Sequence, residues 1–303
     1  MHWKKIKNIF SPNGTSSWMK SHAAVPFVLD ITDDIVRIGF SSRNVEGKSI
    51  LAALDFDMNS MEVKEIVETP LLQNGDNGLF NHDGVMPCQA FTISNEKYLY
   101  YIGWNLGVSV PFRNAIGMAK EENGVFKHLH QGPILDRNIH DPCFVASCCV
   151  IEDEGNYLMY YLSCIRWEII NDVPVHFYHI KIATSVDGFT WLPTGKIAID
   201  FIYDNEYAIS VPRVIKEDNM YKMWYSYRGG PSSETYRIGY AESENGFDWI
   251  RKDQLSGIDV SNKGWDSDMI CYPFLFDHEG ERYMLYNGNG YGKTGFGIAI
   301  LEK

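Results

Sequence analysis

The sequence has little of what marks several large functional classes. Its 303 residues carry a formal net charge of −12, and no basic cluster is dense enough to follow a phosphate backbone, which argues against nucleic acid as the main partner. The apolar runs are short and strand-like, so no membrane span is predicted. The N-terminal stretch MHWKKIKNIFSPNG has lysines but no apolar core, which does not fit a secretory signal.

Cysteines are few and are not spaced as metal ligands. The six cysteines fall in apolar strand-like segments without a CxxC pair, and they are Cys88, Cys143, Cys148, Cys149, Cys164 and Cys271. This pattern predicts free, mostly buried thiols in a reducing compartment, so a cytoplasmic location is expected and a zinc site is not. A phosphate loop with its following lysine and the GxSxG elbow are also missing, and no cofactor is predicted.

Helical periodicity is nearly absent, and short runs rich in Val, Ile, Tyr and Phe dominate instead. The chain is 45% hydrophobic and 14% aromatic, and Asn-Gly, Asp-Gly and Glu-Gly turns separate the runs. These features predict a globular all-β protein.

A repeat of roughly 60 residues runs through the chain. Its anchor segments are SHAAVPFVL (21–29), HDGVMPCQA (82–90), HDPCFVASC (140–148), YAISVPRVI (207–215) and DMICYPFLF (268–276). A turn, an aromatic segment such as KYLYYIGWN, and a third segment such as YRIGYAESENG follow each anchor. A fourth segment follows in the middle units but not in the last one.

The missing fourth segment has a counterpart at the N-terminus. MHWKKIKNIF places Trp3 where Trp191 and Trp249 stand in the fourth segments of units three and four. We therefore predict a single five-bladed β-propeller over residues 1–303, in which strand 1–10 completes the C-terminal blade and leaves no open edge. A two-domain β-sandwich would explain the short strands but not five in-phase repeats. The SVDGFTW and SENGFDW turns are interpreted as scaffold, with their tryptophans packed between blades.

Two His-Asp pairs stand at the start of neighbouring anchor segments. Asp83 and Asp141 align with His22 and Ala208, and Glu206, Asp266 and Asp268 lie just upstream of later anchors. In a propeller such positions face one central cavity, so these acids are predicted to converge there. Enzymes that cleave glycosidic bonds need carboxyl groups held in this way, one protonated and one ionised. The competing interpretation of each acid is a residue that caps backbone N–H groups.

Further polar and aromatic residues near the same end could bind a sugar. The predicted substrate-binding residues are His22, His82, Trp104, Asn105, His140, Arg166, Arg213, Arg228, Asp266, Asp268, Asn287 and Asn289, and Arg43 and Trp167 lie in the same loops. Packing between blades is the alternative for the aromatic residues, and ion pairing is the alternative for the arginines. The histidines show no fixed ligand spacing, so no metal is predicted and a cation in the central channel has no support.

The blade repeat and the HDP motif resemble the five-bladed propeller glycosidases, which include glycoside hydrolase families 43, 32 and 68 and the family 130 phosphorylases. HDP at 140–142 is similar to the Arg-Asp-Pro element of those enzymes, with histidine in place of arginine. The resemblance implies that Asp141 stabilises the transition state or tunes the pKa of its partners, Asp83 is the base or nucleophile, and Glu206 is the general acid. The first repeat has Ser21 and His22 where the family has an acid, so the match is displaced by one blade.

Three hypotheses about function remain open from the sequence. The leading one is a glycoside hydrolase that acts on a soluble oligosaccharide or glycoside. The second is a glycoside phosphorylase or glycosyl transferase in which Arg166, Arg213 or Arg228 holds the phosphate of a phosphorylated or nucleotide sugar. The third is a sugar-binding propeller without catalysis. The sugar, the linkage, the stereochemistry and the oligomeric state are not encoded in any pattern.

Overall fold

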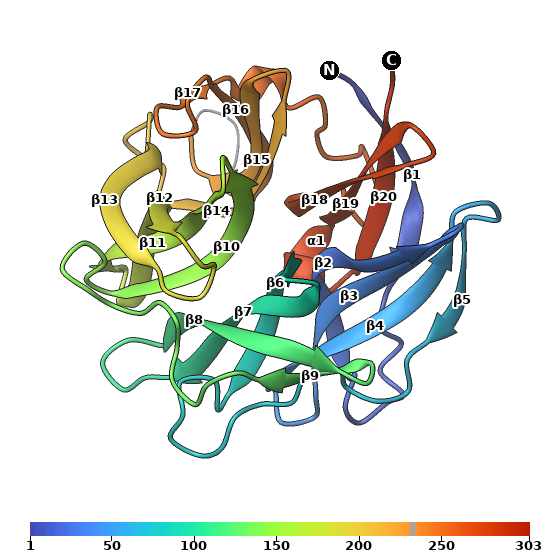
Figure 1. Cartoon of the computed structure of the whole chain (residues 1–303), viewed down its shortest axis with the longest axis horizontal. Coiled ribbons are helices and arrows are strands. Elements are labelled where there is room, and N and C mark those ends of the chain that lie inside the picture. The colour runs from blue at the N-terminus through green and yellow to red at the C-terminus, as the bar shows by residue number, and fades with distance from the viewer. Residues whose placement is uncertain (231–233) are drawn as a thin grey trace.

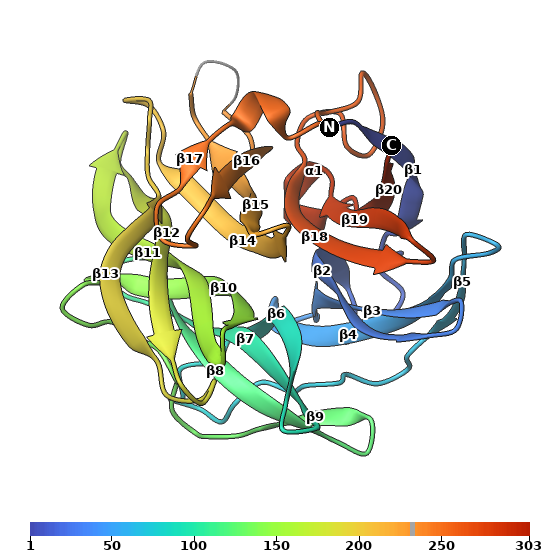
Figure 2. The same ribbon diagram turned by 45° about the horizontal axis from the view of Figure 1, so that its top comes forward.

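Five four-stranded blades are arranged around a central axis (Figures 1 and 2). The computed structural model describes residues 1–230 and 234–303. Within each blade the strands are antiparallel and consecutive, except in the last blade, whose order is β1-β20-β19-β18. Parallel bridges join blades 1 and 2 through Ser49 and Gly84, and blades 3 and 4 through Tyr178 and Ala208. The predicted all-β, five-bladed propeller is confirmed.

The strands fall at the predicted repeats. Blade 1 contains β2 (Ser21–Thr32), β3 (Ile35–Arg43), β4 (Ser49–Asp57) and β5 (Glu62–Ile66). Blade 2 contains β6 (Gly84–Ile93), β7 (Glu96–Leu106), β8 (Phe112–Glu122) and β9 (Val125–His128). Blade 3 contains β10 (Phe144–Asp153), β11 (Asn156–Ile170), β12 (Val173–Ser185) and β13 (Leu192–Ile199). Blade 4 contains β14 (Ala208–Glu217), β15 (Met220–Arg228), β16 (Arg237–Ser243) and β17 (Ile250–Arg251).

Blade 5 combines both ends of the chain. It contains β18 (Cys271–His278), β19 (Glu281–Asn287), β20 (Phe296–Leu301) and β1 (Trp3–Phe10). Strand β1 pairs antiparallel with β20, with Trp3 opposite Leu301, so the two termini lie side by side (Figure 1). The N-terminal strand therefore closes the last blade, as the displaced tryptophan predicts.

Tryptophans pack between neighbouring blades at equivalent places. Trp191 of blade 3 contacts Tyr100 of blade 2, with ring centroids 6.2 Å apart. Trp249 of blade 4 contacts Tyr160 of blade 3 at 5.4 Å. Trp3 meets Trp224 of blade 4 at 6.2 Å in the same way. Edge-to-face contacts of this kind add to the free energy gained by burying the rings, so these tryptophans belong to the scaffold.

The first strands of three blades bend sharply where they line the channel. Val25, Val211 and Tyr272 have positive φ angles of 48°, 48° and 58°, and a proline follows each of them. Bulky and β-branched residues rarely adopt this left-handed conformation, so the surrounding contacts must hold them there. Side-chain oxygens of the preceding blade accept the three backbone N–H groups, and the acceptors are Asn287, Ser147 and Ser226. These bonds join the blades at the centre.

Helical structure is confined to two short segments among the described residues, the 3-10 turn η1 (Asp253–Leu255) and α1 (Asn289–Gly292). Neither is long and apolar enough to cross a membrane. The six cysteines are free, and Cys88 and Cys143 are half-buried while the other four are buried.

Candidate functional site

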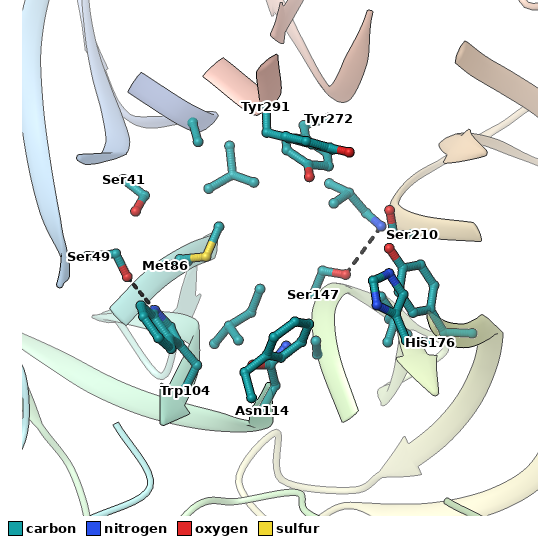
Figure 3. Close-up of a pocket in the computed structure, with 18 of the residues that line it drawn as sticks. Ser41, Ser49, Met86, Trp104, Asn114, Ser147, His176, Ser210, Tyr272 and Tyr291 are labelled. Carbon is teal, nitrogen blue, oxygen red and sulfur yellow. Dashed lines mark hydrogen bonds between the residues drawn. The ribbon is translucent and has the colours of Figure 1, made fainter. Parts of the chain in front are cut away.

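A cavity of about 440 Å³ opens at one end of the central channel. We call it the central cavity. All five blades contribute to it, and Figure 3 shows side chains from around the ring pointing toward an open centre. Its lining includes His22, Ser41, Arg43, Ser49, Met86, Trp104, Phe112, Asn114, Phe144, Ser147, His176, Tyr178, Ser210, Arg228, Tyr236, Tyr272 and Tyr291. The volume lies within the range of small-molecule sites.

Much of the wall comes from one place in the repeat, where the second strand of a blade ends and the third begins. Arg43 pairs with Ser49 in blade 1, and Trp104 pairs with Asn114 in blade 2. Trp104 also donates from Nε1 to the Ser49 hydroxyl of the neighbouring blade at 2.6 Å (Figure 3). The indole is therefore fixed as one wall of the cavity.

The charge of the central cavity is opposite to that of the whole protein. Among the described residues, the charged side chains of its lining are Arg43 and Arg228, and no Asp or Glu is present there. The two histidines of the lining are neutral at pH 7. Burial and nearby Arg43 and Lys293 lower the pKa of His22 to about 4, and burial and Arg228 lower the pKa of His176 to about 4. The cavity is thus electropositive and suits a ligand that carries negative charge.

Arg228 is held by aromatic rings. Its guanidinium lies 4.9 Å from the ring centroid of Tyr207 and 5.3 Å from that of Tyr236, and its Nε donates to the Glu234 carbonyl oxygen at 3.2 Å. Among the residues that the structure describes, it forms no ion pair with a carboxylate. A guanidinium positioned in this way can bind a phosphate or carboxylate of a ligand through two parallel hydrogen bonds.

Hydroxyl groups gather beside Arg228. The phenols of Tyr178 and Tyr236 are hydrogen-bonded to each other, and Ser210 donates to Tyr236 at 3.4 Å. His176 stacks on Tyr178 with the ring planes 5° apart and centroids 4.7 Å apart. Stacked rings with hydroxyl donors and acceptors at their edges can bind the faces and hydroxyls of a sugar.

A second recess, which we call the side groove, has a volume of about 640 Å³. Its lining residues are Arg166, Glu168, Ile170, Pro174, Val175, His176, Phe177, Asp204, Asn205, Tyr207 and Arg228. His176 and Arg228 line both recesses, so the side groove borders the central cavity at these two residues.

Asp141 lies elsewhere than predicted. It is fully buried, and it accepts hydrogen bonds from the Tyr161 phenol at 2.9 Å and from Asn138 at 2.6 Å. Lys181 lies 3.4 Å from its other oxygen. Asp141 is not part of the cavity lining, so the expectation that it faces the central cavity is wrong.

Glu206 is likewise enclosed in a scaffold ion pair. Its two oxygens accept hydrogen bonds from Arg251 at 2.9 and 2.8 Å, and its side chain is 0% exposed. Arg251 in turn contacts Asp253 at 2.6 Å, so the acid belongs to a closed network in blade 4. Glu206 does not line the central cavity.

Asp83 is not the structural equivalent of Asp141. The equivalent residue is Asn81, because each lies 20 residues before a buried second-strand tyrosine that it contacts, Tyr101 for Asn81 and Tyr161 for Asp141. Asp83 itself accepts the Leu106 backbone N–H at 2.8 Å and lies 4.0 Å from His82. It is partly exposed behind the Trp104 wall but is not a lining residue. The three predicted catalytic acids therefore do not meet in the central cavity.

Four of the predicted binding residues line one of the two recesses, and the others do not. Three of them, His22, Trp104 and Arg228, line the central cavity, and Arg166 lines the side groove. Arg213 stacks over Phe274 at 3.7 Å at the narrow end of the channel, where it borders a void of only about 20 Å³.

The remaining predicted binding residues lie outside both recesses. Asp266 repeats the Asp141 arrangement, because it accepts from Tyr286 at 3.1 Å and from Lys5 at 2.7 Å. Asn287 joins blade 5 to blade 1 through Val25, and Asn289 accepts the backbone N–H of Asp268 at 2.8 Å. The others that do not line either recess are His82, Asn105, His140 and Asp268.

Several lining residues were not predicted from the sequence. They include the four serines Ser41, Ser49, Ser147 and Ser210, and also Asn114, His176, Tyr178, Tyr236, Tyr272 and Tyr291. The position of the buried second-strand tyrosines could have identified one of them. The cavity residues Trp104 and Arg228 each stand three residues after such a tyrosine, Tyr101 and Tyr225, and the strand register places Asn114 opposite Trp104. The residues of the strained first strands have no such signal.

One glycine-rich stretch next to the cavity has the letters of a nucleotide-binding motif without its structure. Residues 290–295 read GYGKTG, which matches GxGxxG. In a dinucleotide-binding fold this motif opens a helix after a parallel strand. Here it joins the antiparallel strands β19 and β20, and its only helical part is the four-residue α1. The stretch is therefore a loop of the propeller, and it contributes Tyr291 to the cavity wall.

Among the described residues, one group could supply three ligands to a metal ion, and it lies outside both recesses. It consists of Asp34, His278 and Glu279, whose ligand atoms are within 4.8 Å of one another in two hairpin turns. The described lining of the central cavity has no carboxylate, which makes it a poor donor set for calcium or magnesium.

Comparison with known proteins places the chain in a family. No protein-family model matches it. "Uncharacterized protein Rv1502" of Mycobacterium tuberculosis (strain ATCC 25618 / H37Rv) is 39% identical over 305 residues, covering 100% of both chains. "Uncharacterized protein MT1551" of strain CDC 1551 / Oshkosh is similar to the same extent. The chain belongs to the family of these mycobacterial proteins.

The solved structures that resemble the chain include several glycoside hydrolases. A thermostable family-43 glycoside hydrolase superposes with a TM-score of 0.66 at 20% identity, covering 94% of this chain and 90% of the other. A protein described as "Glycoside hydrolase" gives 0.76 at 17% identity, covering 98% and 90%. A structure from work described as "The GH130 family of mannoside phosphorylases contains glycoside hydrolases that target beta-1,2 mannosidic linkages in Candida mannan" gives 0.70 at 14% identity, covering 99% and 93%. At these identities the likeness establishes the glycosidase-type propeller fold.

Proposed function

We propose that the protein is a carbohydrate-active enzyme whose central cavity binds a sugar that carries a phosphate or another anionic group. The observation that carries this proposal is the electropositive cavity of a protein with a net charge of −12. Arg43 and Arg228 line the cavity, and no carboxylate belongs to the described lining. Aromatic rings and hydroxyls around the arginines supply the surface for the sugar itself. A phosphorylated sugar also agrees with the predicted cytoplasmic location.

Two-carboxylate hydrolysis within this cavity has less support. A glycosidase of that kind holds its two carboxyl groups about 5–9.5 Å apart across the scissile bond. Asp141 and Glu206 are instead sealed in contacts with Lys181 and Arg251. Both carboxylates are held in buried ion pairs and lie outside the cavity lining, so they are not placed to exchange protons with a ligand there.

Within the carbohydrate-active class, transfer to or from phosphate is favoured over hydrolysis. Arg228 lies beside the paired phenols of Tyr178 and Tyr236, so an anionic group bound by the guanidinium would have hydroxyl donors next to it.

Turnover in the presence and absence of inorganic phosphate tests the proposal. The purified protein is incubated with a panel of disaccharides and with sugar 1-phosphates plus acceptor sugars, and products are separated by chromatography. Sugar 1-phosphate formed or consumed in a phosphate-dependent manner supports the proposal. Hydrolysis at the same rate without phosphate would contradict the proposal and favour a glycoside hydrolase. Binding of sugar phosphates without any turnover would leave a sugar-binding propeller as the second candidate.

A further inference from the structure

The central cavity and the side groove border each other at two residues, one neutral and one positively charged. His176 and Arg228 line both recesses. His176 is neutral at pH 7, because burial and Arg228 lower its pKa to about 4. Arg228 therefore provides the positive charge at the junction, with an uncharged hydrogen-bonding ring beside it.

The boundary is built by the longest hairpin among the described strands. Strands β11 and β12 contain 15 and 13 residues, so their turn projects past the end of blade 3. On the cavity side, Trp167 packs against Phe144 and against His176, with ring centroids 6.0 and 5.3 Å apart. On the groove side, Arg166 and Phe177 form the wall. Aromatic packing of Trp167 therefore holds this part of the hairpin in place at the boundary of the two recesses.

The side groove has different chemistry from the central cavity. The Arg166 guanidinium lies 3.9 Å from the centroid of the Phe177 ring and is paired with Glu168, which also lines the groove. Tyr207 lies edge-on to Phe177 at 6.3 Å. Asp204 is exposed and lines the groove, and the adjacent Asn205 is fixed by two hydrogen bonds to Gly230 of 3.0 and 3.1 Å. A flat cation-aromatic stack suits a planar heterocycle, and a carboxylate suits the paired hydroxyls of a ribose.

From this arrangement we propose that the ligand has two parts and is a nucleoside diphosphate sugar. Its sugar occupies the central cavity, its diphosphate meets Arg228 at the junction, and its nucleoside lies in the side groove against Arg166, Phe177 and Asp204. The inference rests on the proposed function, because it extends the same anionic-sugar site into the neighbouring recess. Each recess has the size of a small-molecule site. A ligand that spans both would place its negatively charged diphosphate at Arg228, where the two recesses meet.

Binding measured by isothermal titration calorimetry tests the inference. The probes are glucose 1-phosphate and the uridine, guanosine, adenosine and thymidine diphosphate derivatives of glucose, together with the free nucleoside diphosphates. The variants are Arg166→Ala and Asp204→Ala, with Arg137→Ala and Asp76→Ala as controls of matched type on exposed surface away from both recesses.

We expect at least one nucleoside diphosphate glucose to bind tenfold or more tightly than glucose 1-phosphate. Arg166→Ala and Asp204→Ala should each remove most of that advantage and leave the affinity for glucose 1-phosphate within twofold, and the controls should change neither. Binding of glucose 1-phosphate with no gain from any nucleoside overturns this inference and leaves the proposed function standing. Equal losses for both kinds of probe in the groove variants also overturn it. No binding of any phosphorylated sugar overturns the proposed function as well.

Discussion

The phenol of Tyr161 donates a hydrogen bond of 2.9 Å to the buried carboxylate of Asp141. Tyr286 forms the same bond of 3.1 Å with Asp266, again 20 residues away in sequence. Each carboxylate also has a lysine partner, Lys181 for Asp141 and Lys5 for Asp266. The recurrence in two blades identifies this acid as a part of the blade scaffold.

Asp141→Ala is therefore expected to destabilise the protein. The substitution leaves the buried Lys181 ammonium without its carboxylate partner, and loss of one member of a buried ion pair costs about 3–5 kcal/mol of unfolding free energy. Equilibrium unfolding in urea measures the change, and Asp76→Ala on the exposed surface is the control. An Asp141→Ala protein of wild-type stability that has lost turnover would instead make Asp141 catalytic.

Glu206 and Arg251 should be energetically coupled. Their two hydrogen bonds of 2.9 and 2.8 Å are made by nearly unexposed side chains. Arg251→Ala leaves the buried Glu206 carboxylate without its cation, whereas Glu206→Ala leaves Arg251 paired with Asp253. In a double-mutant cycle the coupling between Glu206→Ala and Arg251→Ala should lie at roughly 1–3 kcal/mol. Additive losses in denaturant unfolding would show that the pair does not act as a unit.

Arg228→Ala is expected to weaken binding of sugar 1-phosphates by tenfold or more. The guanidinium supplies one of the two positive charges in the described lining of the central cavity, and a charge-assisted bidentate contact with phosphate would be lost. Arg228→Lys should recover only part of the affinity, because an ammonium lacks the planar fork. Calorimetry with the exposed Arg137→Ala as control checks this prediction, which fails if neutral glucose loses as much affinity as its phosphate.

Stability should fall as the pH is lowered from about 6.5 toward 4, and His176 should contribute to this loss. Burial, with Arg228 second, lowers the pKa of His176 from 6.5 to about 4 in the folded protein. Between these values the unfolded chain binds a proton that the folded chain does not, so stability is retained above pH 6.5 and declines below it.

His176→Phe keeps a ring against Tyr178 and removes the titrating group. Its free energy of unfolding should depend less steeply on pH between 6.5 and 4 than that of the wild type. His130→Asn, on the exposed surface, should leave the slope unchanged. A wild-type slope in the His176→Phe protein would assign the acid sensitivity to other groups.

The blades could be predicted from the sequence because they depend on local and repeated signals. Trp3 shares its position with Trp191 and Trp249, and each of the three packs on an aromatic residue of the preceding blade. The tryptophan repeat therefore predicts that the N-terminal strand completes the last blade and closes the ring.

The site could be predicted only in part because a shift of two residues changes which structural position a side chain occupies. The His-Asp motif aligns Asp83 with Asp141, but the tyrosine contacts show that Asn81 occupies the Asp141 position. Cavity residues such as Ser210 and Tyr272 depend on first strands bent at Val211 and Tyr272, and the sequence patterns do not reveal these bends. His22, Trp104 and Arg228 were found because they stand at strand ends that face the channel.

A crystal structure of the protein with glucose 1-phosphate tests the central claim most directly. The account predicts the sugar in the central cavity, with phosphate oxygens within hydrogen-bonding distance of the Arg228 guanidinium and no carboxylate in contact with the anomeric carbon. A sugar bound between two carboxylates, or a phosphate located away from both Arg43 and Arg228, would contradict it.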